Sequence, residues 1–366
     1  PEDITEKDRE IFFQVINANL STAQEETITH PDIVFPRQES VIALHWHPEH
    51  IPMDLAIKRL DRMFPNRKSE LIIPTEHNEI ISYAGYSGVE VDCYSMSFNQ
   101  KVQLLLHFKN ENIVKNNVLP VMLEHTRKYR SSQLLNFIHS ITEPFEKHID
   151  AAAKKTGTDQ ETIRFCTIYV QKIKKLIDEH YYQIPNSMFK NKLIRYFFAY
   201  LRKHYNHTVV DRCQNFLKEI KKLVKEDFSL QYFFRTSEII EEARHLKAGI
   251  VIPHPEQFWP ILLAEYDIDG YEVWNPQSQR YTEFLISVVN RMNRLRSNKN
   301  KFLIFMGDDT HLGEKVKDKE FQDQEKVERE VGHQPVWDDL SISKQLIMNQ
   351  VTRETLIREY KKILDN

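Results

Sequence analysis

Short apolar runs that end in a histidine or an acid recur along this chain, and they constrain its fold more than any other feature. The first is VIAL at residues 41–44, which His45 and His47 follow closely. A bounded apolar run of four to eight residues has the length of a buried strand, and segments with helical periodicity separate most of these runs. Strands that alternate with helices are typical of a parallel sheet. The chain is therefore predicted to be an α/β protein.

The predicted strands and helices lie toward the two ends of the chain and leave a middle of different character. We expect strands at 41–44, 70–74, 86–98, 101–108, 250–253, 270–275 and 301–306, and helices at 5–27, 53–64, 236–247, 257–266 and 282–297. From about 111 to 235 the apolar residues follow long helical patterns instead. This middle segment is predicted to be an all-helical insertion.

Composition argues against several classes of protein. The 50 Lys and Arg residues nearly balance the 53 Asp and Glu residues, so the chain as a whole is not a polyanion binder by composition. Cys93, Cys166 and Cys213 form no CxxC motif, which favours a reducing compartment over a disulfide framework. No run reaches the ~18 apolar residues of a membrane span. The polar, acidic first residues differ from a secretion signal. A cytoplasmic protein without a membrane span is expected.

Metal-competent side chains lie in or after six of the apolar runs. In a parallel barrel the carboxyl ends of all strands lie on one face, so side chains that are distant in sequence can meet there. Residues i and i+2 of an extended chain point the same way, so His45 with His47 and Asp309 with His311 would each present two ligands to one point. Imidazole and carboxylate ligands without thiolate suit zinc, manganese or iron. Any one of these residues alone would be an ordinary core or surface residue, and it is their recurrence that indicates a site. The predicted metal ligands are His45, His47, His77, Glu90, His107, His254, Asp309 and His311.

Six short motifs in this order resemble those of the polymerase and histidinol phosphatase (PHP) family. They are HWH, TEH, GVE, LLLHF, AGIVIPHP and GDDTH, where the family has HxH, TDH, GxE, a lone His after a strand, AHP and SDxH. Each motif alone is unspecific, and their common order carries the resemblance. It covers about 40–110 and 236–313, on either side of the helical insertion.

The resemblance implies a distorted (β/α)7 TIM-like barrel with up to three metals and, most often, phosphoester hydrolysis. Residues 1–110 would form the N-terminal half of the barrel with a leading helix, 111–235 the insertion, 236–313 the C-terminal half and 314–366 a helical tail. The resemblance also implies a metal pair, bridged by Glu90, and a third metal. The pair would be held by His45, His47, Glu90, His254 and Asp309, whereas His77, His107 and His311 would complete the pair and the third metal.

Three positions depart from the family pattern. After HxH the family has Ser-Asp or His, whereas this chain offers only His50 or Asp54, neither at the customary offset, as a third-metal or catalytic residue. Glu76 replaces the usual Asp of TDH and is expected to orient His77 from behind. Asp308 is expected either to add a charge near the site or to face solvent.

These features predict a metal-dependent hydrolase that attacks a phosphoester with a hydroxide bridging two or three divalent ions of zinc, manganese or iron. The chain has no GxSxG motif and no P-loop, so a serine nucleophile and nucleotide-driven transfer are disfavoured. The expected substrate is a small phosphorylated metabolite. Arg280 and Arg127 are candidate phosphate contacts by their chemistry alone.

Other functions stay open at this point. The segment 164–225 interleaves aromatic and basic residues, which would suit a nuclease that stacks bases and contacts phosphates. The same spacing is more often a helix core with a solvated face, so this alternative is not favoured. A PHP-like barrel could also hold metal without catalysis. An amidohydrolase usually needs a bridging lysine after a strand, and no predicted strand ends in one. The oligomeric state is left open.

Overall fold

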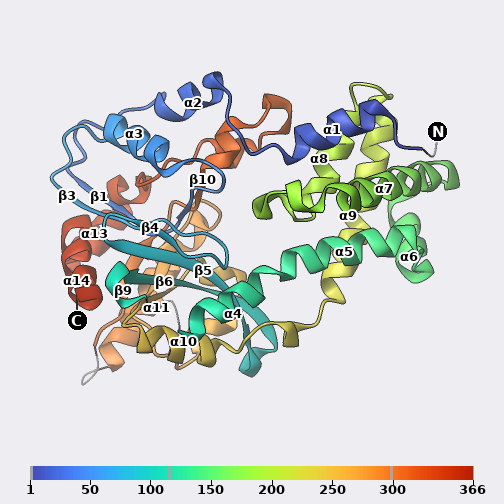
Figure 1. The fold of residues 1–366 in the computed structure, drawn as a ribbon. Helices are drawn as coiled ribbons and strands as arrows, with labels where there is room; N and C mark the ends of the chain where they lie inside the picture. The colour runs from blue at the N-terminus through green and yellow to red at the C-terminus, as the bar shows by residue number, and fades with distance from the viewer. Residues whose placement is uncertain (1–2, 114–116, 297–299, 366) are drawn as a thin grey trace. The chain divides into compact units, whose positions relative to one another are not determined.

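The computed structural model describes residues 3–113, 117–296 and 300–365 (Figure 1). The chain divides into two compact units. The helical unit comprises residues 1–19 and 128–229, and the α/β unit comprises residues 20–127 and 230–366. Among the described helices, none combines the length and the apolar content that crossing a membrane requires.

The helical unit is built on amphipathic helices that bury one apolar face each. Leu176 of α7, Phe197 of α8 and Phe216 of α9 are fully buried in its core. Phe198, which follows Phe197 in the basic and aromatic segment, is also fully buried. These rings therefore pack the core instead of facing a ligand. The helices of this unit are α1 (Glu6–Ile16), α5 (Tyr129–Thr142), α6 (Glu146–Thr156), α7 (Gln160–His180), α8 (Lys192–Leu201) and α9 (His207–Glu226).

The unit boundaries differ from the predicted ones because two helices pack elsewhere than expected. The leading helix α1 belongs to the helical unit, where Phe12 joins its core. Helix α4 (Val118–Arg127) lies in the predicted insertion but belongs to the α/β unit, since Leu119 joins the core there. The predicted helix 5–27 is also two helices, because Ser21 caps a new one, α2 (Thr22–Thr29). Residues 114–116 of the predicted insertion and residue 297 of the predicted helix 282–297 lie outside the described residues.

The α/β unit contains all the strands of the described chain. Its seven longer strands lie where apolar runs predicted them, although most are shorter than predicted. Three short strands, β2, β4 and β10, were not predicted. The strands are β1 (Ser40–Ala43), β2 (Trp46–His47), β3 (Ser69–Ile72), β4 (Ile81–Tyr83), β5 (Tyr86–Ser95), β6 (Gln100–Lys109), β7 (Gly249–Ile252), β8 (Gly270–Trp274), β9 (Leu303–Met306) and β10 (Thr310–His311).

The α/β unit also contains helices, and the last of these, α14, packs into its core. Tyr360 of α14 is fully buried and belongs to the main core of the unit. A Cβ at Gly249 of β7 would overlap the ring of Tyr360, so this glycine permits the close approach. The C-terminal segment is therefore part of the α/β unit. Besides α2 and α4, its helices are α3 (Met53–Met63), α10 (Thr236–His245), α11 (Thr282–Leu295), α12 (Gln324–Val327), α13 (Leu340–Met348) and α14 (Arg353–Asp365).

The largest sheet is mixed, so the expectation of a parallel sheet is only partly met. Its order is β4-β5-β6-β7-β8-β9, with parallel pairs from β7 to β9 and antiparallel pairs from β4 to β7. Strands β5 and β6 are joined by a single turn around Met96–Phe98, with Asn99 in the left-handed region. A parallel connection needs a crossover of about a dozen or more residues. This short turn therefore forces β6 to run antiparallel to β5.

Backbone contacts join the other strands to this sheet. Strands β1 and β3 pair in parallel, and so do β2 and β10. The amide of Asp309, which follows β9, donates to the carbonyl of His45 at 2.8 Å. His77, which follows β3, forms a parallel bridge with Glu90 of β5. These contacts draw the ends of several strands together. The (β/α)7 barrel itself stays a prediction.

A buried ion pair supports the helical unit. Lys172 of α7 donates to the Asp8 carboxylate of α1 at 2.8 Å, and both side chains are almost fully buried. Burial alone would raise the pKa of Asp8, but hydrogen bonds from Lys172 and Thr5 lower it below its ordinary value of 3.8. Because the folded-state pKa is depressed, the pair stabilises the fold above the unfolded-state pKa. This contribution is lost as the pH falls through the folded-state pKa.

We expect Lys172→Met to destabilise the protein by about 3 kcal/mol at neutral pH, because it leaves a buried carboxylate without its cation. The difference from the native protein should shrink in acid, where Asp8 becomes protonated. Urea denaturation followed by circular dichroism at several pH values measures both effects. Lys174→Met is the matched control, because Lys174 lies on the same helix but pairs with the exposed Glu143. This substitution should lower the free energy of unfolding by less than about 1 kcal/mol. Equal losses in the two variants would contradict the assignment.

Candidate metal centre

Seven of the eight predicted ligands converge in the α/β unit. They form three groups in which one candidate ligand atom from each residue lies within 4.8 Å of the others. Side chains that are far apart in sequence therefore do meet in one place. The groups are His47, His77 and His311; His45, Glu90 and His254; and His45, His47 and Asp309.

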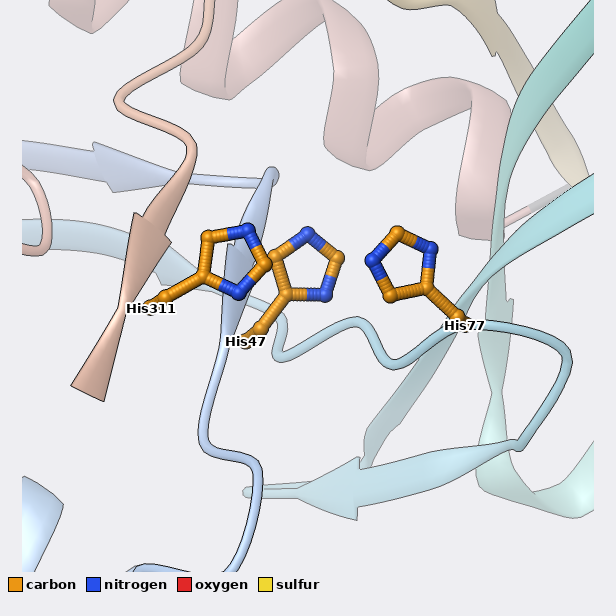
Figure 2. Close-up of side chains that lie close together, drawn as sticks. All are labelled: His47, His77 and His311. Atoms are coloured by element: carbon orange, nitrogen blue, oxygen red, sulfur yellow. The ribbon is translucent and has the colours of Figure 1, made fainter. Parts of the chain in front are cut away.

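The first group is a stack of three imidazoles (Figure 2). The ring of His47 on β2 lies 4.5 Å from that of His77 and 4.4 Å from that of His311, with near-parallel planes. Strands β2 and β10 pair in parallel with His311 opposite His47, which sets two of these rings side by side. His77 reaches the stack from the loop after β3, held by its bridge to Glu90. His47 is fully buried, whereas His77 and His311 retain partly exposed side chains.

Glu90 is a member of the second group and also faces the first. Its Oε1 is 3.4 Å from Nε2 of His254 and 3.8 Å from Nε2 of His45. Its Oε2 is 2.6 Å from Nδ1 of His77 and 3.6 Å from Nε2 of His47. Each carboxylate oxygen therefore approaches a different pair of imidazoles. Glu90 could therefore offer a ligand oxygen to both groups.

Asp309 presents one carboxylate oxygen to three imidazoles. Its Oδ1 lies 3.6 Å from Nε2 of His45, 3.7 Å from Nε2 of His47 and 3.5 Å from Nε2 of His311. Its Oδ2 instead accepts hydrogen bonds from Gln277 at 2.6 Å and Arg329 at 2.9 Å. Oδ2 is thus fixed by hydrogen bonds from the protein, whereas Oδ1 faces the imidazoles.

Buried polar atoms without a partner show that the donor set fits divalent cations. Among the described residues, Nε2 of His45 and both ring nitrogens of His47 are buried and form no hydrogen bond. An unsatisfied buried donor or acceptor costs about 1–3 kcal/mol, and buried polar groups are normally paired. Imidazole nitrogens and carboxylate oxygens that face one another without bonding are the ligands that zinc, manganese and iron take. The residues present therefore fit a metal centre.

The acid–base state of the cluster agrees with this fit. Burial lowers the pKa of His47 well below its usual range, with help from the neighbouring imidazoles of His311 and His77, so His47 is neutral and able to ligate. Burial opposes ionisation of Glu90, but the imidazole of His77 and its neighbours hold the pKa of this carboxyl well below normal. Burial alone would lower the pKa of His45, yet the carboxylate of Glu272 and others raise it to about 10. A cation bound there would displace that proton.

Glu272 of β8 is a site residue that the sequence reasoning missed. Its Oε1 lies 2.9 Å from Nδ1 of His45, and its Oε2 accepts the backbone amide of His254 at 2.8 Å. A carboxylate behind a ligating histidine fixes the ring and leaves the other nitrogen for the metal. Gly307 makes room for it, because a Cβ there would overlap the Glu272 carboxylate. A buried acid in the apolar run GYEVW was the available signal.

Other residues behind the ligands were only partly foreseen. Glu76 accepts the backbone amides of His77 at 3.1 Å and of Glu49 at 3.0 Å, consistent with the orienting role expected for it. Glu49, which was not predicted, lies 3.3 Å from Nδ1 of His311. Arg329 carried no sequence signal, because it stands in a charged segment of the kind that is usually solvated.

Two of the ligands have strained backbones. His254 has φ 28° and Asp309 has φ 47°, both in the left-handed region that residues with a Cβ rarely adopt. Such strain costs about 1–3 kcal/mol and persists where surrounding contacts over-determine the conformation, as at functional sites. The strain therefore supports a functional reason for the positions of these two side chains.

His107 is the predicted ligand that the structure does not bring into the three groups. Its Nε2 lies 2.9 Å from the carbonyl of Leu44, and its Nδ1 lies 2.7 Å from the hydroxyl of Tyr360, so both nitrogens are occupied. Burial lowers its pKa to about 4, which keeps the ring neutral. The cause is the antiparallel direction of β6, which sets His107 opposite Gly249, at the start of β7, whereas His254 follows the end of β7. The carboxyl ends of these two strands therefore lie at opposite edges.

The remaining candidates also lie outside the three groups. Asp54 is exposed on α3, where it pairs with Lys58, and His50 packs beside Gly313. Asp308 does not face solvent: it is buried and accepts the amide of Gly332 at 3.0 Å, and burial raises its pKa to about 7. The candidate phosphate contacts are engaged elsewhere. Arg127 pairs with Glu79 at 2.9 Å, and Arg280 lies over the ring of Tyr281.

Comparisons with known proteins find only distant structural similarity. No family model matches the chain, and no curated protein matches it. One solved structure that it resembles is a protein from Bifidobacterium adolescentis, provisionally described as a metal-dependent phosphoesterase. The two share 13% sequence identity with a TM-score of 0.43, and the similarity covers 87% of this chain and 99% of the other.

We expect Glu272→Gln to weaken metal binding about 10–100-fold, because the carboxylate that orients His45 is lost. Gly307→Ala should produce the same defect by displacing that carboxylate. Calorimetric titration of metal-free protein with Mn²⁺ or Zn²⁺ measures the affinities. Unchanged binding in both variants would show that Glu272 does not support the centre.

A second pair of variants tests whether His254 is a metal ligand and His107 is not. His254→Gln should reduce the amount of bound metal measured by elemental analysis, because it removes an imidazole of the Glu90 group. His107→Gln should keep the full metal content, although losing a buried, doubly bonded ring should lower the melting temperature. Metal loss in His107→Gln at a temperature where it remains folded would restore His107 to the ligand set.

Proposed function

We propose that this protein is a metal-dependent hydrolase of phosphoesters, and that its substrate is a small phosphorylated metabolite. The observation that supports this most is the sharing of ligands between groups. His45 belongs to two of the groups and His47 to two, while Glu90 faces two groups through different oxygens. Cations held by such groups would be immediate neighbours. Neighbouring divalent cations are the arrangement by which many enzymes cleave phosphate esters.

The ligand groups would form two cation positions that differ in their exposure to solvent. His45, Glu90 and His254 would hold one cation in a fully buried position. The stack of His47 with His77 and His311 would hold another where two of the rings remain partly exposed. Asp309 faces His45, His47 and His311 and would serve between the positions. The partly exposed side is therefore where a substrate would approach.

The chemistry divides between the cations and the protein. Divalent ions, when bound, act as Lewis acids and make water nucleophilic at neutral pH. Glu272 holds the His45 ring, and Glu76 holds the backbone at His77 and Glu49. The buried positions of His45, Glu90 and His254 keep bulk water from their ligand atoms, which strengthens electrostatic interactions there.

The cysteines support water, and not a thiol, as the nucleophile. Cys93, Cys166 and Cys213 are all buried. Burial raises the pKa of Cys93 to about 12, so its thiol stays protonated at neutral pH. Reactive cysteines are instead accessible and have lowered pKa values. A thiolate-dependent mechanism is thus disfavoured for these residues.

The small-molecule substrate is favoured over a nucleic acid by the packing of the helical unit. Phe197 and Phe198, which would stack on bases in a nuclease, are fully buried in the core. Tyr181, Tyr182 and Tyr205 are exposed, but three rings alone do not make a binding track. The basic residues between them then belong to a solvated face, which is the ordinary reason for such a pattern.

The test is metal content together with hydrolysis of an aryl phosphate in the presence of Mn²⁺ or Zn²⁺. We expect two or more metals per chain, and hydrolysis that falls more than about 100-fold in His47→Ala, because losing a ligand should exceed the usual cost of losing a supporting residue. Asp54→Ala, an exposed change outside the cluster, should keep both. Metal without hydrolysis of any phosphoester would indicate a binding protein. Faster, salt-sensitive cleavage of single-stranded oligonucleotides would instead indicate a nuclease.

A further inference from the structure

Asp309 is held by hydrogen bonds to its main chain and its side chain, although its backbone conformation is unfavourable. At φ 47° a residue with a Cβ costs about 1–2 kcal/mol relative to right-handed backbone. Its amide donates to the carbonyl of His45 at 2.8 Å. Its carbonyl and its Oδ2 both accept hydrogen bonds from Nη1 of Arg329, at 3.0 and 2.9 Å. Gln277 donates to the same Oδ2 at 2.6 Å.

Arg329 joins the main chain and the side chain of Asp309 through a single nitrogen. One donor that binds both the carbonyl and Oδ2 fixes the side-chain torsions relative to the backbone. The carboxylate then cannot rotate without breaking a buried, charge-assisted hydrogen bond. The Arg329 side chain is only 5% exposed, so water cannot readily replace it. The effect is to leave Oδ1 as the oxygen that faces the imidazoles of His45, His47 and His311.

Two physical effects of Arg329 on a bound cation have opposite signs. Its positive charge lies beside a ligand carboxylate, and by repulsion it should weaken cation binding. Its hydrogen bonds orient that carboxylate and should strengthen binding, as residues behind metal ligands generally do. The two hydrogen bonds at 3.0 and 2.9 Å have normal lengths, and they tie the carbonyl and Oδ2 to one buried nitrogen, which fixes the orientation of the carboxylate. We therefore expect orientation to dominate.

We propose that Arg329 is a positioning residue of the metal centre, which holds Asp309 so that it ligates through Oδ1 alone. The inference deepens the proposed function, since it rests on the same centre. It does not require that the bound metals catalyse hydrolysis. It assigns Gln277, which is exposed, a supporting role on the same oxygen.

The test is calorimetric titration of metal-free protein with Mn²⁺, without substrate. Arg329→Met, which replaces the aliphatic stem but removes the charge and the donors, should bind Mn²⁺ about 10–100-fold more weakly. Arg329→Lys restores the charge and one donor and should recover part of the loss. An affinity that is unchanged or increased in Arg329→Met would overturn the proposal, because repulsion would then be the larger effect.

The control is Arg353→Met, which removes another largely buried arginine of the same unit. Arg353 bonds to Asp338 and the carbonyl of Gln334 and should change the melting temperature but not the Mn²⁺ affinity. If Arg329→Met does not fold, Gln277→Ala and Arg329→Lys carry the test, and native affinity in both would overturn it. A native protein that binds Mn²⁺ but hydrolyses no phosphoester would refute the proposed function and leave the role of Arg329 measurable.

Discussion

Two ionised carboxylates buried among imidazoles are the constraint on which the rest of this structure depends. Removing a charged group from water costs several kcal/mol unless other charges or hydrogen bonds compensate it. Glu90 and Asp309 meet this requirement through facing histidines, and Asp309 also through Arg329. Several of the histidine nitrogens have no other partner. Divalent cations would satisfy both sets of atoms together, which is why the cluster is best explained as a metal centre.

The α/β unit assembles this cluster through backbone contacts as much as through side chains. The parallel pairing of β2 with β10 sets His47 beside His311, and the bridge between His77 and Glu90 carries a loop residue to the sheet. Residues behind the ligands then limit their freedom. Glu272, whose carboxylate occupies the space above Gly307, fixes His45. The ligands are therefore positioned both by strand pairing and by the side chains behind them.

The success of the sequence-based reasoning follows from local chemistry. Apolar runs of strand length predicted the longer strands, and seven predicted ligands do converge, because each lies in a strand or within a few residues of the end of one. The reasoning assumed that all strands run the same way. The short turn between β5 and β6 reverses β6, and His107 consequently bonds to Leu44 and Tyr360. The domain limits also differ from the predicted ones, because α1 and α4 pack their apolar faces against cores that no local sequence pattern identifies.

The sequence by itself determined which residues could ligate a metal, because periodicity and residue type reveal where apolar strands end in imidazoles or carboxylates. Only the tertiary structure decided which of them face one another. Strand direction, the parallel bridge at His77 and the left-handed backbone at Asp309 are consequences of long-range pairing and packing. The supporting roles of Glu272 and Arg329 were hidden for the same reason. Their partners are distant in sequence, and a lone acid or arginine carries no sign of what it will contact.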